Sequence, residues 1–519
     1  MRTRDLFITL LLTFCLSMTT SAQIVFQKAF GGTNDDYGTS VQQTADRGYI
    51  FTGATRSFSK GQYNIYLLKT DSVGDTLWTS TFGDINSEYG YCLQQTSDKG
   101  YIICGWYDSL TGWSSRNMFI MKTDSNGNSM WMKGIESGGP AEALSVQQTH
   151  DGGYIIGGHI NTMPLEHFCL IKINPNGTNA WGKTYGGITN CTNYCVKQLG
   201  DGGYIMLGDG TIFGDVSLIR VDSSGSLLWS KSYGGVANAE SGYAVLQASD
   251  GGFIISGSTR SFGSGASDVY VIKTDSAGSL LWSKTYGGLY NDFGMGIQKT
   301  ADGGYILTGY CYVTPTDDDV YLLKLTALGD TLWTRSFGGP GADWAQSVNL
   351  ARDGGYIIVG STSSFGAGNS DVYLIKTDSN GNTAHCHQGQ FHTTITVPPT
   401  LTSNPVTLVS SIAMVDFPFY GIGGGAYVTT ICSTVGIPEI KTSNSFSIYP
   451  NPTNHNFVLQ LGSDYHKGRL QIFNILGEKI YEQDLEQVST TISLNASTGI
   501  YLVKLSDGQK SVVKKLFIQ

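Results

Sequence analysis

Three features of the sequence predict an all-β fold, and together they predict a seven-bladed β-propeller. First, a segment spelled Asp-Gly-Gly-Tyr-Ile-Ile, or a close variant of it, recurs seven times. Its aromatic residue falls at Tyr49, Tyr101, Tyr154, Tyr204, Phe253, Tyr305 and Tyr356. Second, a period of about 50 residues is typical of propeller blades, since no such unit can bury its own faces alone. Third, 68 Gly, 29 Tyr and only 14% charged residues favour short strands and tight turns over helices.

One repeat, residues 293–337, illustrates the predicted blade. Its four strand-like pieces span 293–300, 304–309, 319–325 and 331–337. The turn signals Ala-Asp-Gly-Gly and Ala-Leu-Gly-Asp separate the first two pieces and the last two. Because four antiparallel strands joined by hairpins form one blade, we expect every repeat to contribute a four-stranded sheet.

The two ends of the repeat array predict how the ring closes. A tryptophan marks the fourth strand of six repeats, at Trp78, Trp131, Trp181, Trp229, Trp282 and Trp333. The seventh repeat has His385 at this place and lacks its own outer strand. Residues 24–30, followed by two glycines, match the fourth-strand pattern with Phe26 in place of Trp. We therefore predict that the first strand of the mature chain completes the last blade and removes an open edge.

The start of the chain predicts export. Arg2 and Arg4 precede an apolar run over 6–16, and small residues before Gln23 suit cleavage by a signal peptidase. The run is too short to span a membrane, so residues 1–22 are predicted to be a signal peptide and 23–383 the propeller. No later apolar run reaches the length of a membrane helix, and we predict no transmembrane anchor.

Charge and cysteine usage limit the partners. A formal net charge of −9 at pH 7 disfavours nucleic acid. An exported chain permits disulfides, and the candidate pairs are Cys92 with Cys104, Cys191 with Cys195, and Cys386 with Cys432. None of these has the Cys-x-x-Cys spacing of a zinc site, and we predict no metal and no cofactor.

Residues that occur in every repeat are predicted to serve the scaffold. A basic residue occupies one position in all seven copies, at Lys69, Lys122, Lys172, Arg220, Lys273, Lys324 and Lys376. We expect it to line a strand end and to bond to the next turn rather than to bind an anion. The tryptophans are likewise expected to pack between blades.

Two acidic or polar series are predicted to lie on one rim of the propeller. The first strand begins with Asp36, Glu88, Glu240, Asp292 and Asp343, while Ala141 and Cys191 interrupt this series. The third strand begins with Asn64, Asn117, His167, Asp215, Asp268, Asp319 and Asp371. These side chains either cap turn amides or hold a hard cation such as calcium. Capping is preferred, because repetition argues against a single specific site.

Departures from the repeat predict where a ligand binds. Three repeats share a short loop between their second and third strands, whereas the second and third repeats have longer, aromatic or polar loops. The candidate ligand-binding residues in these two loops are Trp106, Tyr107, Trp113, Arg116, His159 and His167. Their rings and donors suit a glycan or protein ligand. The alternative is that the loops only pack over the blade ends.

An enzymatic role is the competing hypothesis. No familiar catalytic motif occurs, and no catalytic residue is predicted. An extracellular polysaccharide hydrolase or lyase would use Glu88 or Glu142 together with His159 on the rim. A purely structural role at the cell surface is a third hypothesis.

The sequence changes character after the last repeat. Residues 384–440 are predicted to be a β-rich linker, and residues 441–519 a small antiparallel β-sandwich with alternating apolar positions. Its motifs are Tyr-Pro-Asn-Pro, Phe-Asn-Ile-Leu-Gly, Gly-Ile-Tyr and a terminal Lys-Lys. Their characteristic residues are Pro450, Asn451, Pro452, Gly477, Gly499, Tyr501, Lys514 and Lys515.

These motifs resemble the type A C-terminal sorting domain of type IX secretion cargo, a family known from Bacteroidetes-type bacteria. The resemblance implies passage through the periplasm, recognition of this domain by the secretion machinery, and release from or attachment to the outer-membrane surface. An ordinary accessory β-sandwich is the alternative. The repeats resemble uncharacterised secreted bacterial β-propellers, a family that assigns no catalytic residues. The expected function is a secreted or surface-displayed module for binding or adhesion.

Overall fold

The computed structural model describes most of the chain in two compact units, Met1–Gly436 and Ile437–Gln519. The described residues are 23–383, the strand residues between 388 and 434, and 446–518. The gaps in these ranges are 109–115, 136–138, 162–164, 187–191, 211–213, 236–237, 450–452, 454–455, 462–467, 475–477, 498 and 507–510. Every regular element in the described ranges is a β-strand. Within them, no helix is long and apolar enough to cross a membrane.

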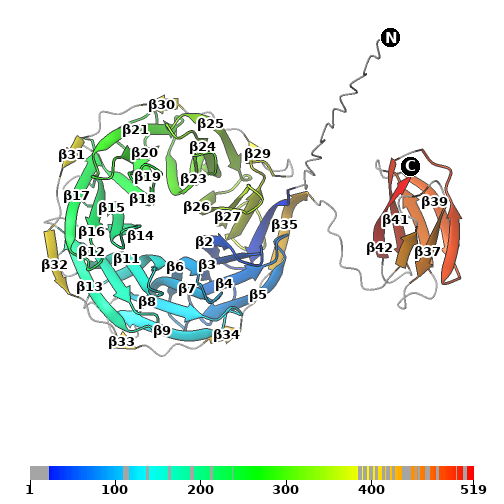
Figure 1. Ribbon diagram of the computed structural model, residues 1–519, viewed down its shortest axis with the longest axis horizontal. Helices are drawn as coiled ribbons and strands as arrows, with labels where there is room; N and C mark the ends of the chain where they lie inside the picture. Colours follow the sequence, from blue (N-terminus) through cyan, green and yellow to red (C-terminus); the bar gives the residue numbers. More distant parts are fainter. Residues whose placement is uncertain are drawn as a thin grey trace, which may run out of the picture. The chain divides into compact units, whose positions relative to one another are not determined.

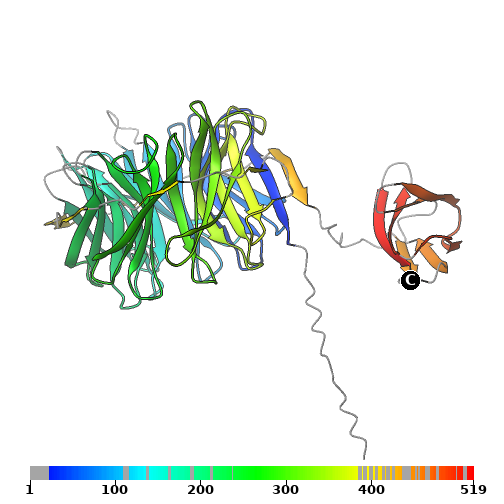
Figure 2. The same cartoon turned by 90° about the horizontal axis from the view of Figure 1, so that it is seen from above.

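The first unit is a propeller-like ring of antiparallel sheets (Figures 1 and 2). Within the described residues, seven sheets each contain five strands, and each sheet is named below by its innermost strand. The innermost strands are β2 (Asp36–Gln43), β6 (Glu88–Gln95), β10 (Ala141–Gln148), β14 (Thr192–Gln198), β18 (Glu240–Gln247), β22 (Asp292–Lys299) and β26 (Asp343–Leu350). The second strands are β3 (Tyr49–Thr55), β7 (Tyr101–Asp108), β11 (Tyr154–Asn161), β15 (Tyr204–Asp209), β19 (Phe253–Thr259), β23 (Tyr305–Thr314) and β27 (Tyr356–Thr362).

Two further strands of each sheet come from the repeats and from the chain start. The third strands are β4 (Asn64–Thr70), β8 (Arg116–Thr123), β12 (Glu166–Ile173), β16 (Val216–Val221), β20 (Asp268–Thr274), β24 (Asp317–Leu325) and β28 (Asp371–Thr377). The fourth strands are β5 (Thr76–Phe82), β9 (Ser129–Ile135), β13 (Asn179–Gly186), β17 (Leu227–Gly234), β21 (Leu280–Gly287), β25 (Thr331–Phe337) and β1 (Val25–Gly31). All consecutive strands pair antiparallel, as tight hairpins require.

Strand β1 joins the β26 sheet, although it lies about 350 residues from its partner in sequence. It pairs antiparallel with β28, with Phe26 opposite Lys376 and Phe30 opposite Val372. The Phe26 ring lies 5.9 Å from the Tyr49 ring in an edge-on contact. Trp131 makes the same contact with Tyr154 at 6.0 Å, so Phe26 has the packing role of the repeat tryptophans.

The recurring lysines and Arg220 are confirmed as scaffold residues. Lys376 is fully buried, and its ammonium donates to Thr377 O and to Asp353, both at 2.8 Å. Lys69 makes the equivalent bonds to Thr70 O and Asp46. Each basic side chain therefore joins the end of the third strand to the turn between the first and second strands. The buried charge is compensated by a partly exposed carboxylate.

The described parts of residues 388–434, which lie in the predicted β-rich linker, form a belt around the ring. They supply the fifth strands β29 (Gln388–Gly389), β30 (Thr394–Thr396), β31 (Leu401–Ser403), β32 (Thr407–Ser411), β33 (Val415–Asp416), β34 (Gly421–Gly423) and β35 (Tyr427–Thr434). These pair in turn with β25, β21, β17, β13, β9, β5 and β1, so the belt visits the sheets in reverse chain order (Figure 1). Every fourth strand thereby gains a partner on its outer edge.

The second unit contains two antiparallel sheets around one core. One sheet contains β36 (Phe446–Tyr449), β37 (Asn456–Leu461) and β40 (Ser489–Ser493); the other contains β39 (Lys479–Leu485), β38 (Gly468–Phe473), β41 (Gly499–Ser506) and β42 (Ser511–Ile518). Buried residues of both sheets, among them Phe457, Leu470 and Val503, form a single cluster. Such packing is typical of a β-sandwich.

The sandwich places four of the predicted motif residues. Gly499 begins β41, and the buried Tyr501 donates its hydroxyl proton to Ser497 O at 2.7 Å. The Lys514 ammonium bonds to Phe446 O and lies 5.2 Å from the centre of the Phe446 ring. Lys515 lies on β42. Pro450, Asn451, Pro452 and Gly477 lie outside the described residues.

The predicted Cys92–Cys104 disulfide is not formed. The two residues are direct cross-strand partners on β6 and β7, but both are free thiols. The Cys104 thiol instead faces Ala143 O at 3.5 Å, and Cys92 faces Val146 O at 3.8 Å. Both side chains therefore pack toward the β10 sheet rather than toward each other. Cys191 and Cys386 lie outside the described residues, Cys195 lies on β14 and Cys432 on β35.

Candidate ligand-binding site

A β-bulge interrupts the innermost strand of every sheet at the same place. In the β2 sheet, the register shifts between Gly38 and Ser40, so no residue of β3 lies directly opposite Thr39, whose hydroxyl donates to Thr52 O at 3.1 Å. The equivalent bulge residues are Tyr91, Leu144, Tyr194, Tyr243, Met295 and Gln346. A bulge adds one unpaired residue and redirects its side chain, so this distortion is repeated once per sheet.

The bulge residues of the ring line one central pocket of about 400 Å³. Its wall consists of Thr39, Tyr91, Leu144, Tyr194, Tyr243, Met295 and Gln346, together with Glu142 and His159 from the β10 sheet. Each innermost strand thus contributes one side chain. Pockets of this size that combine aromatic walls with a few polar groups are typical of small-ligand sites.

Three tyrosines give the pocket its aromatic and hydrogen-bonding character. The Tyr194 and Tyr243 rings lie 5.3 Å apart in an edge-on contact. Burial raises the pKa of Tyr194 far above its usual range, and the nearby Asp209 acts in the same direction. Burial likewise raises the pKa of Tyr91. Tyr91 and Tyr194 are therefore neutral phenols at physiological pH, which both donate and accept hydrogen bonds.

Glu142 brings charge to the pocket wall and is held by Arg116. The Arg116 Nη1 atom lies 2.6 Å from Glu142 Oε1, and the Glu142 side chain is 13% exposed. The Arg116 guanidinium also lies 4.2 Å from the centre of the Trp106 ring. Trp106 in turn stacks on Tyr89 with ring centres 4.8 Å apart. The charge-assisted contact with Arg116 therefore fixes the orientation of the Glu142 carboxylate, and Trp106 holds the Arg116 guanidinium in place.

His159 lies directly across the β10–β11 pair from Glu142. Burial lowers the pKa of this imidazole, while Glu142 and Glu166 act in the opposite direction. Its Nδ1 atom is buried and has no hydrogen-bond partner. A neutral imidazole beside a carboxylate can accept a proton or a hydrogen bond from a ligand hydroxyl.

The other predicted ligand-binding residues lie elsewhere. Tyr107 is buried at 2% exposure and belongs to a core cluster. His167 is buried at the start of β12, beside Gly186, and burial lowers its pKa. Trp113 lies outside the described residues. Of the predicted residues that the structure describes, His159 lines the central pocket, whereas Tyr107 and His167 do not. Arg116 contacts Glu142 of the pocket wall, and Trp106 contacts Arg116.

The rim carboxylates cap turn amides, the preferred one of the two predicted roles. Asp36 Oδ2 accepts hydrogen bonds from the Gly32 amide at 2.8 Å and from the Ser57 hydroxyl at 2.6 Å. Asp371 Oδ2 accepts bonds from the Ala367 and Gly368 amides. Among the described residues, no group of three or more His, Cys, Asp and Glu side chains is arranged to hold a metal ion.

Sequence reasoning missed the bulge residues. Thr39, Tyr91, Tyr194 and Gln346 occupy the same repeat position, the bulge of the innermost strand, where the repeats differ in size and polarity. A comparison of the seven repeats residue by residue finds this position when it includes the strands as well as the loops. The predicted ligand-binding residues came instead from the loops between the second and third strands, because these loops differ in length between the repeats.

The C-terminal unit belongs to a known family of export signals. Residues 447–519 match the family model of a secretion system C-terminal sorting domain. The chain is therefore secreted or attached to the cell surface, and its C-terminal domain interacts with the secretion machinery. No curated protein matches the chain in sequence.

Several solved structures are similar in arrangement at low identity. Sqt1 from Chaetomium thermophilum has 11% identity, covers 69% of this chain and 85% of its own, and has a TM-score of 0.40. The tail fibre of Staphylococcus aureus phage P68 has 8% identity, covers 73% and 91%, and has a TM-score of 0.24. A GH43_12 protein from a capybara gut metagenome has 9% identity, covers 96% and 89%, and has a TM-score of 0.25.

Proposed function

We propose that this protein is a secreted glycan-binding propeller whose ligand enters the central pocket. The observation that carries the proposal is the convergence of seven bulge residues, one from each innermost strand, on one pocket of about 400 Å³. Bulges that redirect side chains into a common space are typical of functional positions. The sorting domain at 447–519 supports an extracellular ligand.

The chemistry of the wall favours a glycan over an apolar ligand. Tyr91, Tyr194 and Tyr243 offer hydroxyls and ring edges, and Gln346 and Thr39 add donors and acceptors. A sugar presents both hydroxyls and apolar ring faces, which such a mixed wall matches. A segment of a protein ligand is the less favoured occupant.

We further infer seven blades closed by the N-terminal strand, with 23–383 as the propeller domain. The pairing of β1 with β28 and the contact of Phe26 with Tyr49 support this inference. On this inference, residues 1–22 are the signal peptide that directs export across the inner membrane. Residues 384–440 contain the belt, and residues 441–519 are the sorting domain that directs export across the outer membrane. The source would be a bacterium with type IX secretion.

The test is binding of the purified mature chain to a glycan array, followed by titration of each hit. Tyr194→Phe removes one pocket hydroxyl and keeps the ring, so it should weaken binding about tenfold through one lost hydrogen bond. Tyr290→Phe is the matched control, because Tyr290 is exposed and does not line the pocket. Equal loss in both variants, or no hit, would contradict the proposal.

A hydrolase or lyase is the second candidate, favoured by the opposition of Glu142 and His159 across one strand pair. A carboxylate and a neutral imidazole in one pocket are the groups that acid–base chemistry on a sugar requires. Product analysis of every array hit distinguishes the two functions. Retention without new reducing ends or unsaturated products supports binding, whereas products that disappear in Glu142→Gln support the enzyme.

A further inference from the structure

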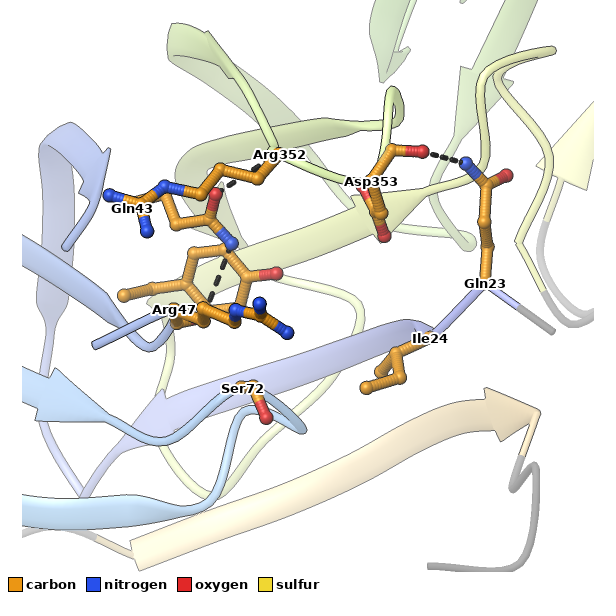
Figure 3. A pocket seen from close by; sticks show the side chains of 8 residues that line it. Gln23, Ile24, Gln43, Arg47, Ser72, Arg352 and Asp353 are labelled. Atoms are coloured by element: carbon orange, nitrogen blue, oxygen red, sulfur yellow. Dashed lines mark hydrogen bonds between the residues drawn. The ribbon is translucent and has the colours of Figure 1, made fainter. Parts of the chain in front are cut away.

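A second pocket lies where the β26 sheet adjoins the β2 sheet, and none of the bulge residues lines it. Its volume is about 420 Å³, and the side chains that matter here are Gln23, Gln43, Arg47, Ser72, Arg352 and Asp353. Figure 3 shows the Arg47 side chain extending toward the space bordered by Ser72, Ile24 and Gln23. The pocket therefore combines residues from the chain start and from the first and last repeats.

Both arginines of this pocket depart from the repeat. Arg352 stands where the other six repeats have Ala45, Ser97, His150, Gly200, Ser249 and Ala301. Arg47 stands where five repeats have glycine and one has Lys99. The two departures come from opposite ends of the array and share one pocket only because these sheets are neighbours. The Arg352 amide confirms this contact by donating to Gln43 Oε1 at 2.8 Å.

Arg47 is held in a backbone conformation that favours glycine. Its φ is 72°, in the left-handed region, and the glycine at the same turn position in the third repeat, Gly152, has a φ of 81°. A side chain at this position strains the turn, so glycine would serve the fold better. Strain of this kind is retained where a side chain has a function that offsets it.

The charge that faces the pocket is positive. Among the described residues, the Arg47 guanidinium has no hydrogen-bond or ion-pair partner. Arg352 Nη1 donates to Ala45 O at 3.1 Å and meets no carboxylate. Asp353 is the one acid in the lining, and the buried Lys376 ammonium at 2.8 Å compensates it. An anion would therefore find an unpaired guanidinium here.

The remaining lining favours an anion that also carries hydroxyls. Gln43 Nε2 donates to Arg47 O at 3.2 Å, and Gln23 Oε1 accepts from the Ser379 amide at 3.1 Å, which holds both amide groups in place. Each amide retains capacity for a further hydrogen bond, and Ser72 and the carboxylate of Asp353 can accept from hydroxyls. A bare inorganic anion would leave these acceptors unused.

We propose that this pocket binds an acidic sugar of the uronic acid class, with its carboxylate on Arg47 and its hydroxyls on Gln43, Ser72 and Asp353. The site is separate from the central pocket and does not depend on the function proposed for it. Its volume of about 420 Å³ suits a monosaccharide unit rather than a protein surface.

The test is calorimetric titration of the purified full mature chain with galacturonate, with galactose and sulfate as comparison probes. We expect galacturonate to bind, to weaken as salt rises, and to outcompete both comparison probes at least tenfold. Arg47→Gly should reduce this binding at least tenfold while the melting temperature stays the same or rises, because glycine is the residue that the turn favours.

Lys99→Gly is the matched control, since Lys99 has a φ of 67° at the same turn position and lines no part of this pocket. It should leave galacturonate binding unchanged. Absence of galacturonate binding, equal binding of sulfate, or unchanged binding in Arg47→Gly would each overturn the proposal. Tyr194→Phe should also leave it unchanged, which separates this site from the central pocket.

Discussion

Asp371 and Asp36 meet across the junction between the β26 and β2 sheets, and both are buried. A Cβ atom added at Gly31 would overlap Asp371 Oδ1 and lie 2.6 Å from Asp36 Oδ2, so the two carboxyl groups face the same small space. The same arrangement occurs at two other junctions. A Cβ atom added at Gly287 would lie against Asp268 and Asp292, and one added at Gly338 would lie against Asp319 and Asp343. Two buried carboxyl groups this close do not both ionise readily, so we expect each pair to retain one proton near neutral pH.

The repeats support this relationship through their exceptions. Where Ala141 or Cys191 interrupts the acidic series in the sequence, the neighbouring repeat has Asn117 or His167 at the third-strand position instead of an aspartate. Where the innermost strand has Glu88, its neighbour is Asn64, whose neutral amide resembles a protonated carboxyl group in shape. A third-strand aspartate therefore occurs only beside an acid, as expected if the two groups form one proton-sharing unit.

The first prediction concerns pH. Burial raises the pKa of Asp292 and of Asp319 to about 7, and that of Asp371 to about 6. The folded state thus binds more protons than the unfolded state between about pH 4 and 7, and the free energy of unfolding falls as pH rises through this window. Thermal unfolding of the mature chain should show a higher melting temperature at pH 5 than at pH 8.

The control for the pH prediction is Asp371→Asn, which copies the natural Asn64. It should fold and should reduce the slope of stability against pH. Asp46 and Asp302 do not obscure the effect, because their pKa values are lowered by their turn and lysine partners and their contribution is lost only below about pH 4. Stability that rises from pH 5 to pH 8 would refute proton sharing.

The second prediction concerns the buried lysine of the scaffold. Asp353→Ala leaves the fully buried Lys376 ammonium without its carboxylate, and should lower the free energy of unfolding by about 3 kcal/mol. Urea unfolding measures this loss. Asp330→Ala is the control, because its partner Lys284 is partly exposed and such pairs contribute less than about 1 kcal/mol. Similar losses in the two variants would count against a buried role for Lys376.

The third prediction concerns ring closure by β1. Phe26 is 1% exposed and packs on Tyr49, so Phe26→Ala should lower the free energy of unfolding by about 3–5 kcal/mol. Ile24→Ala, at a residue that is 36% exposed, should have a far smaller effect. Urea unfolding compares the two. A small loss for Phe26→Ala would mean that the strand contributes little to closure.

The fourth prediction concerns the belt. A chain that ends at Thr383 loses the fifth strands β29–β35 and exposes the outer edge of each fourth strand. Unpaired edges favour association between chains, so light scattering should detect oligomers or aggregates that a chain ending at Gly436 does not form. A monomer with an unchanged melting temperature would indicate that the belt is dispensable for the fold.

Local sequence determined most of the ring. The repeated turn of Asp and Gly residues, the alternating apolar positions and the tryptophans predict hairpins whose partners are close in the chain, and the sorting motif predicts the second unit. The position of Phe26 in the fourth-strand pattern even predicts a pairing with a strand about 350 residues away. These features can be predicted from the sequence because each repeat has the same pattern of apolar residues, which become the buried residues of each sheet.

Tertiary structure alone decided the belt, the two pockets and the positions of several predicted site residues. Five of the seven described belt strands have only two or three residues, too few to show a hydrophobic period, and the belt strands pair because the ring offers them an open edge. Trp106 stacks on Tyr89 instead of facing solvent. Arg47 and Arg352 line the same pocket only because the first and last repeats are neighbours in the ring. Alternation along a strand shows which face is buried, but the neighbours that cover it depend on contacts between residues hundreds of positions apart.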